Sequence, residues 1–489
     1  MTDVVPPGWT IARIRDVAEI NPRHPANLDP AMAVSFIPMP CVSDSKPDFD
    51  RVHERQLDEV RKGYTHFADG DVLFAKITPC MENGKGAVAR ALRNGIGCGT
   101  TELHVIRPTE AVDPYYLYHY LHQQRVRREA AANFTGSAGQ LRVPVSFMAE
   151  LRVPLPPLAE QRRILVALDA VLDKVAACQA RLAKIPTILK RFRQAVLAAA
   201  CSGRLTADWR AQHAVSMTSA NGPAECGDVE PLTDAPEEWR WTMLNSLCDL
   251  QRGICYGVIK LGKPIVDGIP CLRTSDVRWL RIDETGVKRI SPDISADFER
   301  SILRGAEVLV NVRGSLGGVA VVPARMRGWN VSREVAVVPV TRVVPEFVAR
   351  WIASGISQAW LTGVTRGVAY TGINLEDLRL LPIAVPPLRE QQQIVRRVDA
   401  LFSVADQIEE RFRKASAHVD KLTQAVLAKA FRGELVPTEA ELARAEGREY
   451  EPASVLLERI RTKRSALNGA GERAERRTRR KTGRARRPE

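Results

Sequence analysis

The stretch PPLAEQRRILVALDA, from Pro156 to Ala170, decides the fold, because the chain repeats it as PPLREQQQIVRRVDA from Pro386 to Ala400. Between residues 155–205 and 385–435 the two copies align without a gap, and 18 of the 51 aligned positions are identical. Internal repetition has to be settled before individual elements, and a repeat of this spacing is far too long for a solenoid. We therefore interpret the chain as a duplicated two-part module.

The second part of each module is predicted to be a long helix. After each Pro pair, apolar residues recur at alternating steps of four and three, which is the heptad pattern of a coiled coil. Because one such helix would not stay folded alone, we expect the two copies to pack on each other, antiparallel if a two-fold relates the modules. Pro186 has no counterpart and should kink or break the first helix near Ala183. The seam residues are Ile164, Leu168, Val175, Leu182, Leu189 and Val196 in the first copy, and Ile394, Val398, Leu401, Ile408, Phe412, Leu422 and Val426 in the second.

The first part of each module is predicted to be a mixed α/β domain. Both contain apolar β-rich runs, such as Asp71–Ile77 and Glu307–Val312, and both begin near a tryptophan, Trp9 or Trp239. The expected fold class is therefore α+β, with two such domains, each followed by a long helix, and pseudo-two-fold symmetry. The expected order is a first domain at 1–153, a helix at 154–206, an extended linker at 207–235, a second domain at 236–383, a helix at 384–436, a C-terminal helical segment at 437–470 and a disordered basic tail at 471–489.

The charge of the chain favours a polyanionic partner. The formal net charge is +14. Residues 471–489 contain nine Lys or Arg and three Glu, so this tail supplies +6 and the body keeps +8. A basic body is typical of nucleic-acid binding, with a solvated basic surface as the simpler alternative. No apolar run is long enough for a membrane helix and the N-terminus has no signal pattern, so we expect a cytoplasmic protein without a membrane partner.

The sequence offers no convincing catalytic motif. The run Gly95–Gly99 precedes a β-like stretch and not a helix, so we interpret it as a flexible turn and not as a dinucleotide loop. Asn83-Gly84-Lys85 lacks the remaining residues of a phosphate-binding P-loop. His119 and His122 stand one turn apart among four tyrosines, which favours a packed helix over a metal site. We expect no metal, no cofactor and no covalent chemistry in this chain.

These motifs resemble those of a known family. PLPPLAEQ and VPPLREQ each open a helix that ends QAVLA-x-A-x-x-G-x-L, and the doubled pattern is similar to the two conserved regions of type I restriction-modification specificity subunits. The stretch Gly433–Arg461 resembles the C-terminus of that family. The resemblance covers nearly the whole chain, although the basic tail departs from the plain family ending.

The resemblance implies a sequence-specific DNA-binding subunit of a type I restriction-modification complex. Two target recognition domains would each read half of a bipartite, asymmetric double-stranded DNA sequence, and the coiled coil would fix their separation. Two methylation subunits and two restriction or motor subunits would dock on it. S-adenosylmethionine, ATP and magnesium would belong to those partners. The chain itself would not be an enzyme.

The loops after the shared β-rich runs are the best candidates for DNA contact, because loops on a rigid scaffold usually carry recognition. Arginine can pair with guanine and asparagine with adenine, whereas lysine mostly contacts phosphate. For each residue the alternative is a solvated surface charge. The candidates are Lys76, Asn83, Lys85 and Arg90 in the first domain, and Arg313, Ser315, Arg333, Arg366 and Tyr370 in the second.

Two other functions remain open at this point. One is a coiled-coil scaffold whose end domains bind protein. The other is a fused DNA methyltransferase or nuclease, which the absent motifs disfavour. The target bases and the length of the spacer between the half-sites do not follow from the sequence.

Overall fold

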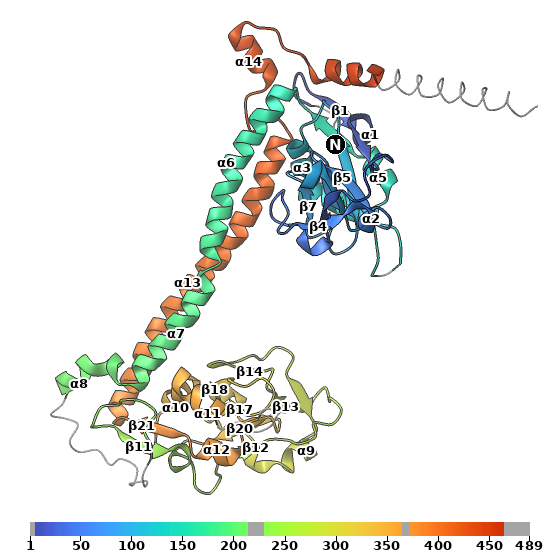
Figure 1. The fold of residues 1–489 in the computed structure, drawn as a ribbon. Coiled ribbons are helices and arrows are strands. Elements are labelled where there is room, and N and C mark those ends of the chain that lie inside the picture. Colours follow the sequence, from blue (N-terminus) through green and yellow to red (C-terminus); the bar gives the residue numbers. More distant parts are fainter. Residues whose placement is uncertain (1–4, 138, 214–228, 364–371, 464–489) are drawn as a thin grey trace, which may run out of the picture. The chain divides into compact units, whose positions relative to one another are not determined.

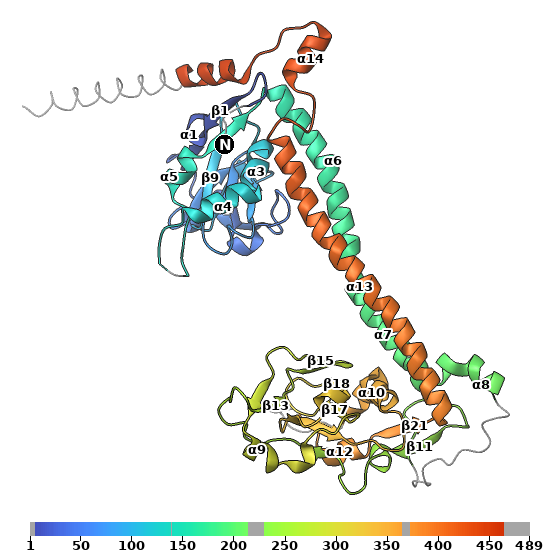
Figure 2. The same ribbon diagram turned by 180° about the vertical axis from the view of Figure 1, so that it is seen from behind.

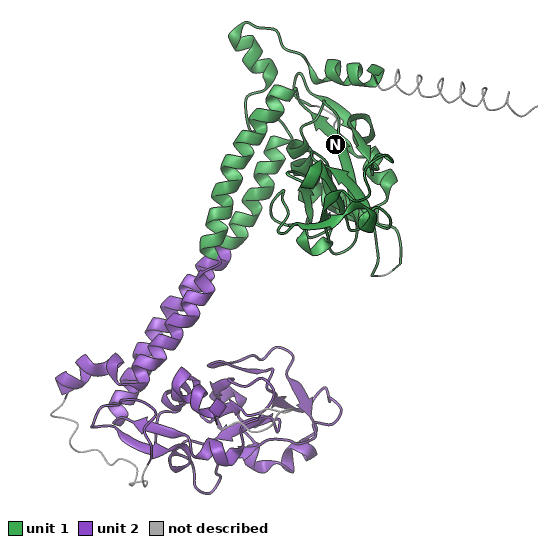
Figure 3. Ribbon diagram, viewed as in Figure 1, with its two compact units in different colours: residues 1–182, 415–489 green, residues 183–414 purple. Residues whose placement is uncertain are grey.

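The computed structural model describes residues 5–137, 139–213, 229–363 and 372–463. Contacts divide the chain into two compact units (Figure 3): unit 1 combines residues 1–182 with 415–489, and unit 2 consists of residues 183–414. Each unit contains one globular domain together with parts of the long helices. The boundaries predicted above between domains, helices and linker stay predictions.

The globular domain of unit 1 contains two four-stranded sheets (Figure 1). One is antiparallel throughout, with the order β2-β9-β6-β7. Its strands are β2 (Ala18–Ile20), β9 (Leu103–Pro108), β6 (Val72–Ala75) and β7 (Gly86–Val88). The other has the order β4-β3-β8-β5, built from β4 (His53–Gln56), β3 (Ala33–Ile37), β8 (Ile96–Gly99) and β5 (Thr65–Ala68). The helices are α1 (Ile14–Val17), α2 (Leu57–Val60), α3 (Pro114–Leu121), α4 (Gln124–Ala132) and α5 (Val145–Glu150).

The domain of unit 2 repeats the strand order of the first sheet, and its second sheet is shorter. Its main sheet has the order β12-β20-β17-β18, from β12 (Cys255–Tyr256), β20 (Val335–Val338), β17 (Val308–Asn311) and β18 (Val319–Val321). A second sheet, β16-β13-β19, is built from β16 (Lys288–Ile290), β13 (Ile269–Leu272) and β19 (Asn330–Val331), and β14 (Val277–Arg278) pairs with β15 (Arg281–Ile282). The helices are α9 (Pro292–Ala296), α10 (Pro345–Ala353), α11 (Gly355–Gly363) and α12 (Leu375–Arg379). The strands expected from the β-rich runs are confirmed as β6 and β17.

Each central strand is buried on both faces, which explains its continuous apolar sequence. In β6, Val72 and Phe74 belong to the largest core of unit 1, whereas Leu73 and Ala75 pack in a separate core on the opposite face. In unit 2, β17 divides its residues in the same way between two cores. A strand that alternated polar and apolar residues could not occupy this position.

The first and last strands of each domain pair with each other. In unit 1, β1 (Thr10–Arg13) is antiparallel to β10 (Arg152–Leu155). In unit 2, β11 (Arg240–Met243) is antiparallel to β21 (Pro382–Val385). The chain therefore enters and leaves each domain at one place, directly before the Pro pair that precedes the following helix.

The repeated Glu of the PPLxEQ motif joins each domain to its helix. The indole Nε1 of Trp9 donates to Glu160 Oε1 at 2.8 Å, and that of Trp239 donates to Glu390 Oε2 at 3.0 Å. The remaining oxygen of Glu160 accepts the backbone N–H of Glu439 at 2.8 Å. Both Glu160 and Glu390 are fully buried, so these bonds satisfy carboxylates that have left water. The repeated residues are thus alike because both copies make the same junction.

The repeated Gln holds the neighbouring loop. Gln161 donates to the carbonyls of Ala111 and Pro156 and accepts the N–H of Asp113 at 2.8 Å. Gln391 likewise donates to Pro386 and accepts the N–H of Val344 at 2.8 Å.

The long helices differ in continuity, as Pro186 predicted. The first is divided into α6 (Leu158–Leu182) and α7 (Ile185–Cys201), with Pro186 in the first turn of α7, whereas α13 (Leu388–Ala430) is unbroken. The C-terminal part of α13 lies beside α6 within unit 1 in both views (Figure 1 and Figure 2), and Gln179 donates to Asp420 there at 3.2 Å. Within unit 2, Arg193 of α7 pairs with Asp406 and Glu409 of α13 at 2.6 and 2.7 Å.

Two expectations about irregular segments are wrong. The linker does not begin as an extended tether, because Ala207–His213 forms helix α8. Asp208, in the first turn of α8, forms an ion pair with Arg397 of α13 at 2.6 Å, and this contact holds the segment against α13. Most of the linker, residues 214–228, lies outside the described residues.

The run Gly95–Gly99 is not a flexible turn, because Ile96–Gly99 is strand β8, where Cys98 is fully buried. Its glycines are explained by packing, since a Cβ on Gly97 would lie 2.1 Å from the ring of Phe67.

The C-terminal segment, predicted to be helical at 437–470, contains α14 (Glu439–Glu446) and continues with helical residues 453–463. Ala453, Leu456, Leu457 and Ile460 join the largest core of unit 1, so the short amphipathic helix is confirmed. The tail from residue 464 lies outside the described residues. Among the described helices, none has the length and hydropathy needed to cross a membrane.

Candidate nucleic-acid interface

In the first domain the candidate residues surround the hairpin of β6 and β7, and their surroundings differ. Asn83 is exposed, and Lys76, half-buried, forms no ion pair within the described residues. Lys85 points inward, because its Nζ donates to the carbonyls of Val42 at 2.7 Å and Met39 at 3.3 Å. Arg90 is exposed but paired with Asp48 at 2.7 Å. The geometry therefore favours Lys76 and Asn83 for contact with a partner.

In the second domain Arg313 and Ser315 are exposed on the corresponding hairpin, between β17 and β18. The guanidinium carbon of Arg313 lies 5.9 Å from the ring centroid of Tyr256. Arg333 is exposed and pairs with its neighbour Glu334 at 3.1 Å. Arg366 and Tyr370 lie outside the described residues. The hairpin thus brings together two of the five predicted residues, Arg313 and Ser315.

Asn311, at the end of β17, holds this hairpin in place. Its Nδ2 lies 3.0–3.1 Å from the carbonyl oxygens of Thr274, Val277 and Ser315, which share its two N–H donors, and its side chain is buried. Sequence reasoning missed this residue, because an asparagine that ends a strand has no spacing signature. The amide ties the hairpin to the turn at residues 274–277.

Replacement of Asn311 with Ala is expected to loosen the hairpin. Three buried or part-buried carbonyls would lose their donor, at a cost of about 1–3 kcal/mol. Amide hydrogen exchange in residues 313–318 should become faster, while Asn245→Ala, at an exposed site of the same domain, should leave it unchanged. Unchanged exchange in Asn311→Ala would contradict this role.

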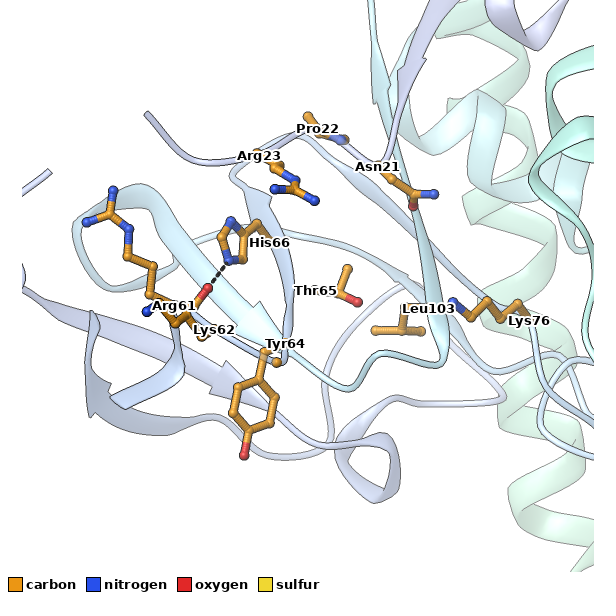
Figure 4. A pocket seen from close by; sticks show the side chains of 11 residues that line it. Asn21, Pro22, Arg23, Arg61, Lys62, Tyr64, Thr65, His66, Lys76 and Leu103 are labelled. Atoms are coloured by element: carbon orange, nitrogen blue, oxygen red, sulfur yellow. Dashed lines mark hydrogen bonds between the residues drawn. The ribbon is translucent and has the colours of Figure 1, made fainter. Parts of the chain in front are cut away.

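A basic cleft in the first domain was also missed by the sequence analysis. It has a volume of about 450 Å³ and lies between the loop after β2, the turn before β5 and the end of β6 (Figure 4). Arg23, Arg61, Lys62, Tyr64 and His66 line it together with Lys76. These residues come from three separate segments, so no local pattern marks them. Only Lys76 was among the predicted site residues.

The helical seam is buried unevenly. Ile164, Leu168, Leu189, Val196, Ile394 and Val398 are buried, and Val175, Leu182, Leu401, Phe412 and Val426 are half-buried. Ile408 and Leu422 are 41% and 40% exposed, so they are not core residues of this chain. The physical reason is that a straight α-helix drifts relative to a heptad pattern, and a single neighbouring helix covers only part of the stripe.

The histidine pair is confirmed as part of a packed helix. His119 lies in α3 and is buried, and His122 caps that helix with its ring stacked 3.8 Å from the ring of Tyr118. In the part of the chain that the structure describes, no group of three or more potential metal ligands occurs.

Two domains with the same main-sheet order, each joined through the same Trp–Glu junction to a long helix, define a duplicated two-domain subunit. The chain belongs to the family described as type I restriction modification DNA specificity domain, whose model matches residues 6–187 and 263–415. The resemblance seen in the sequence is therefore confirmed.

One relative is the type I restriction enzyme EcoBI specificity subunit of Escherichia coli, which is 39% identical over 323 residues. That alignment spans 65% of this chain and 65% of the relative. The fold is shared with a chain solved in work on complex assembly and conformational transition of the type I R-M system (TM-score 0.67, 21% identity, covering 88% of this chain and 99% of that one). It is also shared with the HsdS subunit from Thermoanaerobacter tengcongensis (TM-score 0.54, 22% identity, 88% and 98% covered). The EcoBI relative is a specificity subunit, which agrees with the prediction that this chain is not the catalytic component.

Proposed function

We propose that this chain reads a bipartite, asymmetric DNA sequence for a type I restriction-modification complex, with one half-site for each domain. The observation that carries the proposal is the contrast between the junctions and the hairpins. The junctions use the same Trp, Glu and Gln in both copies. The hairpins, in equivalent places, present Lys76 and Asn83 in one domain but Arg313 and Ser315 in the other. Different side chains on one scaffold suit two different base sequences.

We further propose that the helices form an antiparallel coiled coil with pseudo-two-fold symmetry that spaces the two domains. The contacts of Gln179 with Asp420 and of Arg193 with Asp406 support this pairing. The proposal includes docking of methylation and restriction subunits on this spacer. Ile408 and Leu422 are exposed apolar residues of the seam, and such residues favour a protein partner when they occur on one helix. S-adenosylmethionine, ATP and magnesium would be bound by those partners.

The test is an exchange of domains. Residues 236–383 are replaced with the corresponding domain of another family member, and methylation by the assembled complex is mapped on genomic DNA. One half of the recognised sequence should change while the other half is kept. A change in both halves, or in neither, would contradict two independent readers. The unaltered chain in the same complex is the control.

A further inference from the structure

The charged side chains that line the basic cleft of the first domain are all positive. Four cations line it, Arg23, Arg61, Lys62 and Lys76, and no carboxylate is among the lining residues. In the described part of the chain, none of these four forms an ion pair. Cations gathered in a cleft without counter-charges raise the local concentration of anions.

Two acids near the cleft are already paired with arginines. Asp71 accepts two hydrogen bonds from Arg107, both at 2.8 Å, and Glu102 accepts two from Arg142 at 2.9 and 2.7 Å. Such bidentate pairs are among the strongest contacts of a carboxylate. Burial lowers the pKa of Lys76, although the nearby Glu102 opposes this shift. An anion in the cleft would oppose this shift, because it would stabilise the charged form of the lysine.

The walls of the cleft are held in place before any ligand binds. His66 accepts the N–H of His24 at Nδ1 and donates from Nε2 to the carbonyl of Arg61, and the two imidazole rings stack at 4.5 Å. Arg61 donates to the carbonyls of Pro25 and Ala26, which fixes its guanidinium at one edge. Figure 4 shows the cationic side chains distributed around this rim. A preorganised wall reduces the entropy lost on binding.

The aromatic side chain of Tyr64 in the lining bears on the chemical class of the ligand. Tyr64 is 38% exposed, and its ring stands edge-on to Phe36 with centroids 5.0 Å apart. Tyrosine is among the side chains that donate hydrogen bonds to the phosphates and sugars of DNA, so Tyr64 suits a DNA backbone beside the four cations.

We propose that this cleft binds phosphates of the DNA backbone and so fixes the register of the first domain on its half-site. The proposal rests on the proposed function, since it assumes that this domain reads DNA. It assigns the affinity to Arg23, Lys62 and Lys76, so that Lys76 contacts phosphate and base reading is left to Asn83 and the rest of the hairpin. Phosphate contacts position a protein on DNA but do not by themselves carry sequence information.

The test compares the salt dependence of DNA binding by the full chain, wild type against Arg23→Ala and Lys62→Ala. Both residues are exposed, so their removal should leave the fold intact. In each variant the fall of log K with log salt should become less steep, by about 0.9 for every phosphate that the protein no longer neutralises. The affinity advantage of the wild type should then shrink about threefold between 50 and 200 mM salt. Arg459→Ala is the matched control, because Arg459 is exposed and paired with Glu451 at 3.1 Å.

The outcomes separate this proposal from the proposed function. If the wild type prefers its mapped target over scrambled DNA but both variants keep the wild-type slope, the cleft assignment is wrong and the function stands. If the wild type has no sequence preference, the proposed function is wrong, whatever slopes the variants show. In a further experiment the protein is titrated with inorganic phosphate at constant ionic strength. Phosphate binding that Arg23→Ala abolishes, with an unchanged DNA slope, would assign the cleft to a small anion and overturn the proposal.

Discussion

Replacement of Glu390 with Ala is expected to destabilise unit 2 by about 3–5 kcal/mol. The carboxylate is fully buried and accepts hydrogen bonds from Trp239, Thr206 and Arg210. Its removal would leave the guanidinium of Arg210, which is only 16% exposed, without its counter-charge. Because these bonds join the second domain to α13 and to the segment after α7, the destabilisation should extend through that whole domain.

The measurement is amide hydrogen exchange in the full chain, followed separately for residues 236–363 and 5–137. Exchange in the first range should accelerate strongly, whereas the second range should keep its protection. Glu284→Ala is the matched control, since Glu284 forms an exposed ion pair with Arg325 in the same domain. Surface pairs of this kind contribute about 0–1 kcal/mol. Equal effects of the two substitutions would show that the junction is not a structural anchor.

Acid is expected to destabilise the first domain selectively. Burial lowers the pKa of His104 and His119 to about 4 and that of His122 to about 3. In the unfolded chain these histidines take up protons near pH 6.5, so the unfolded state binds more protons and stability falls as the pH drops from about 6.5 to 4. At pH 5 each histidine should cost roughly 1–2 kcal/mol. Residues 236–383 contain no histidine, so the second domain lacks this source of acid sensitivity.

Thermal unfolding at pH 7 and pH 5, with hydrogen exchange to locate the change, tests this expectation. His119→Phe should reduce the loss between the two pH values, because burial alone lowers the pKa of His119. His418→Gln is the control, as His418 is exposed on α13. A loss of stability that is equal in both domains, or that His119→Phe leaves untouched, would refute the assignment.

The parts of the fold that the sequence predicted are those with a signal within one short stretch of chain. Continuous apolar runs indicated the buried strands β6 and β17, and Pro186 indicated the break between α6 and α7. The Glu-Gln pair was visible as a repeat, but its partner Trp9 stands 151 residues before Glu160, and no local pattern joins them. Gly97 was misread for the same reason, because the ring that requires it, Phe67, comes from another strand.

The candidate site was predictable only in part. The hairpins were located from the strands that precede them, yet the sequence could not show that Lys85 turns inward to the carbonyl of Val42. The basic cleft depends on the meeting of three segments, so it required the tertiary structure. Charges are visible in a sequence, whereas their pairing is a property of the fold.

The strand pairs β1–β10 and β11–β21 affect how a domain can be exchanged between genes. Because each domain begins and ends on adjacent strands, both of its ends meet the rest of the chain at one place. A foreign domain of the same family, introduced by two crossovers at those ends, would bring a strand pair that fits the host helices. The proposed half-site of that domain would then change in one step, while the junctions of the host chain are kept.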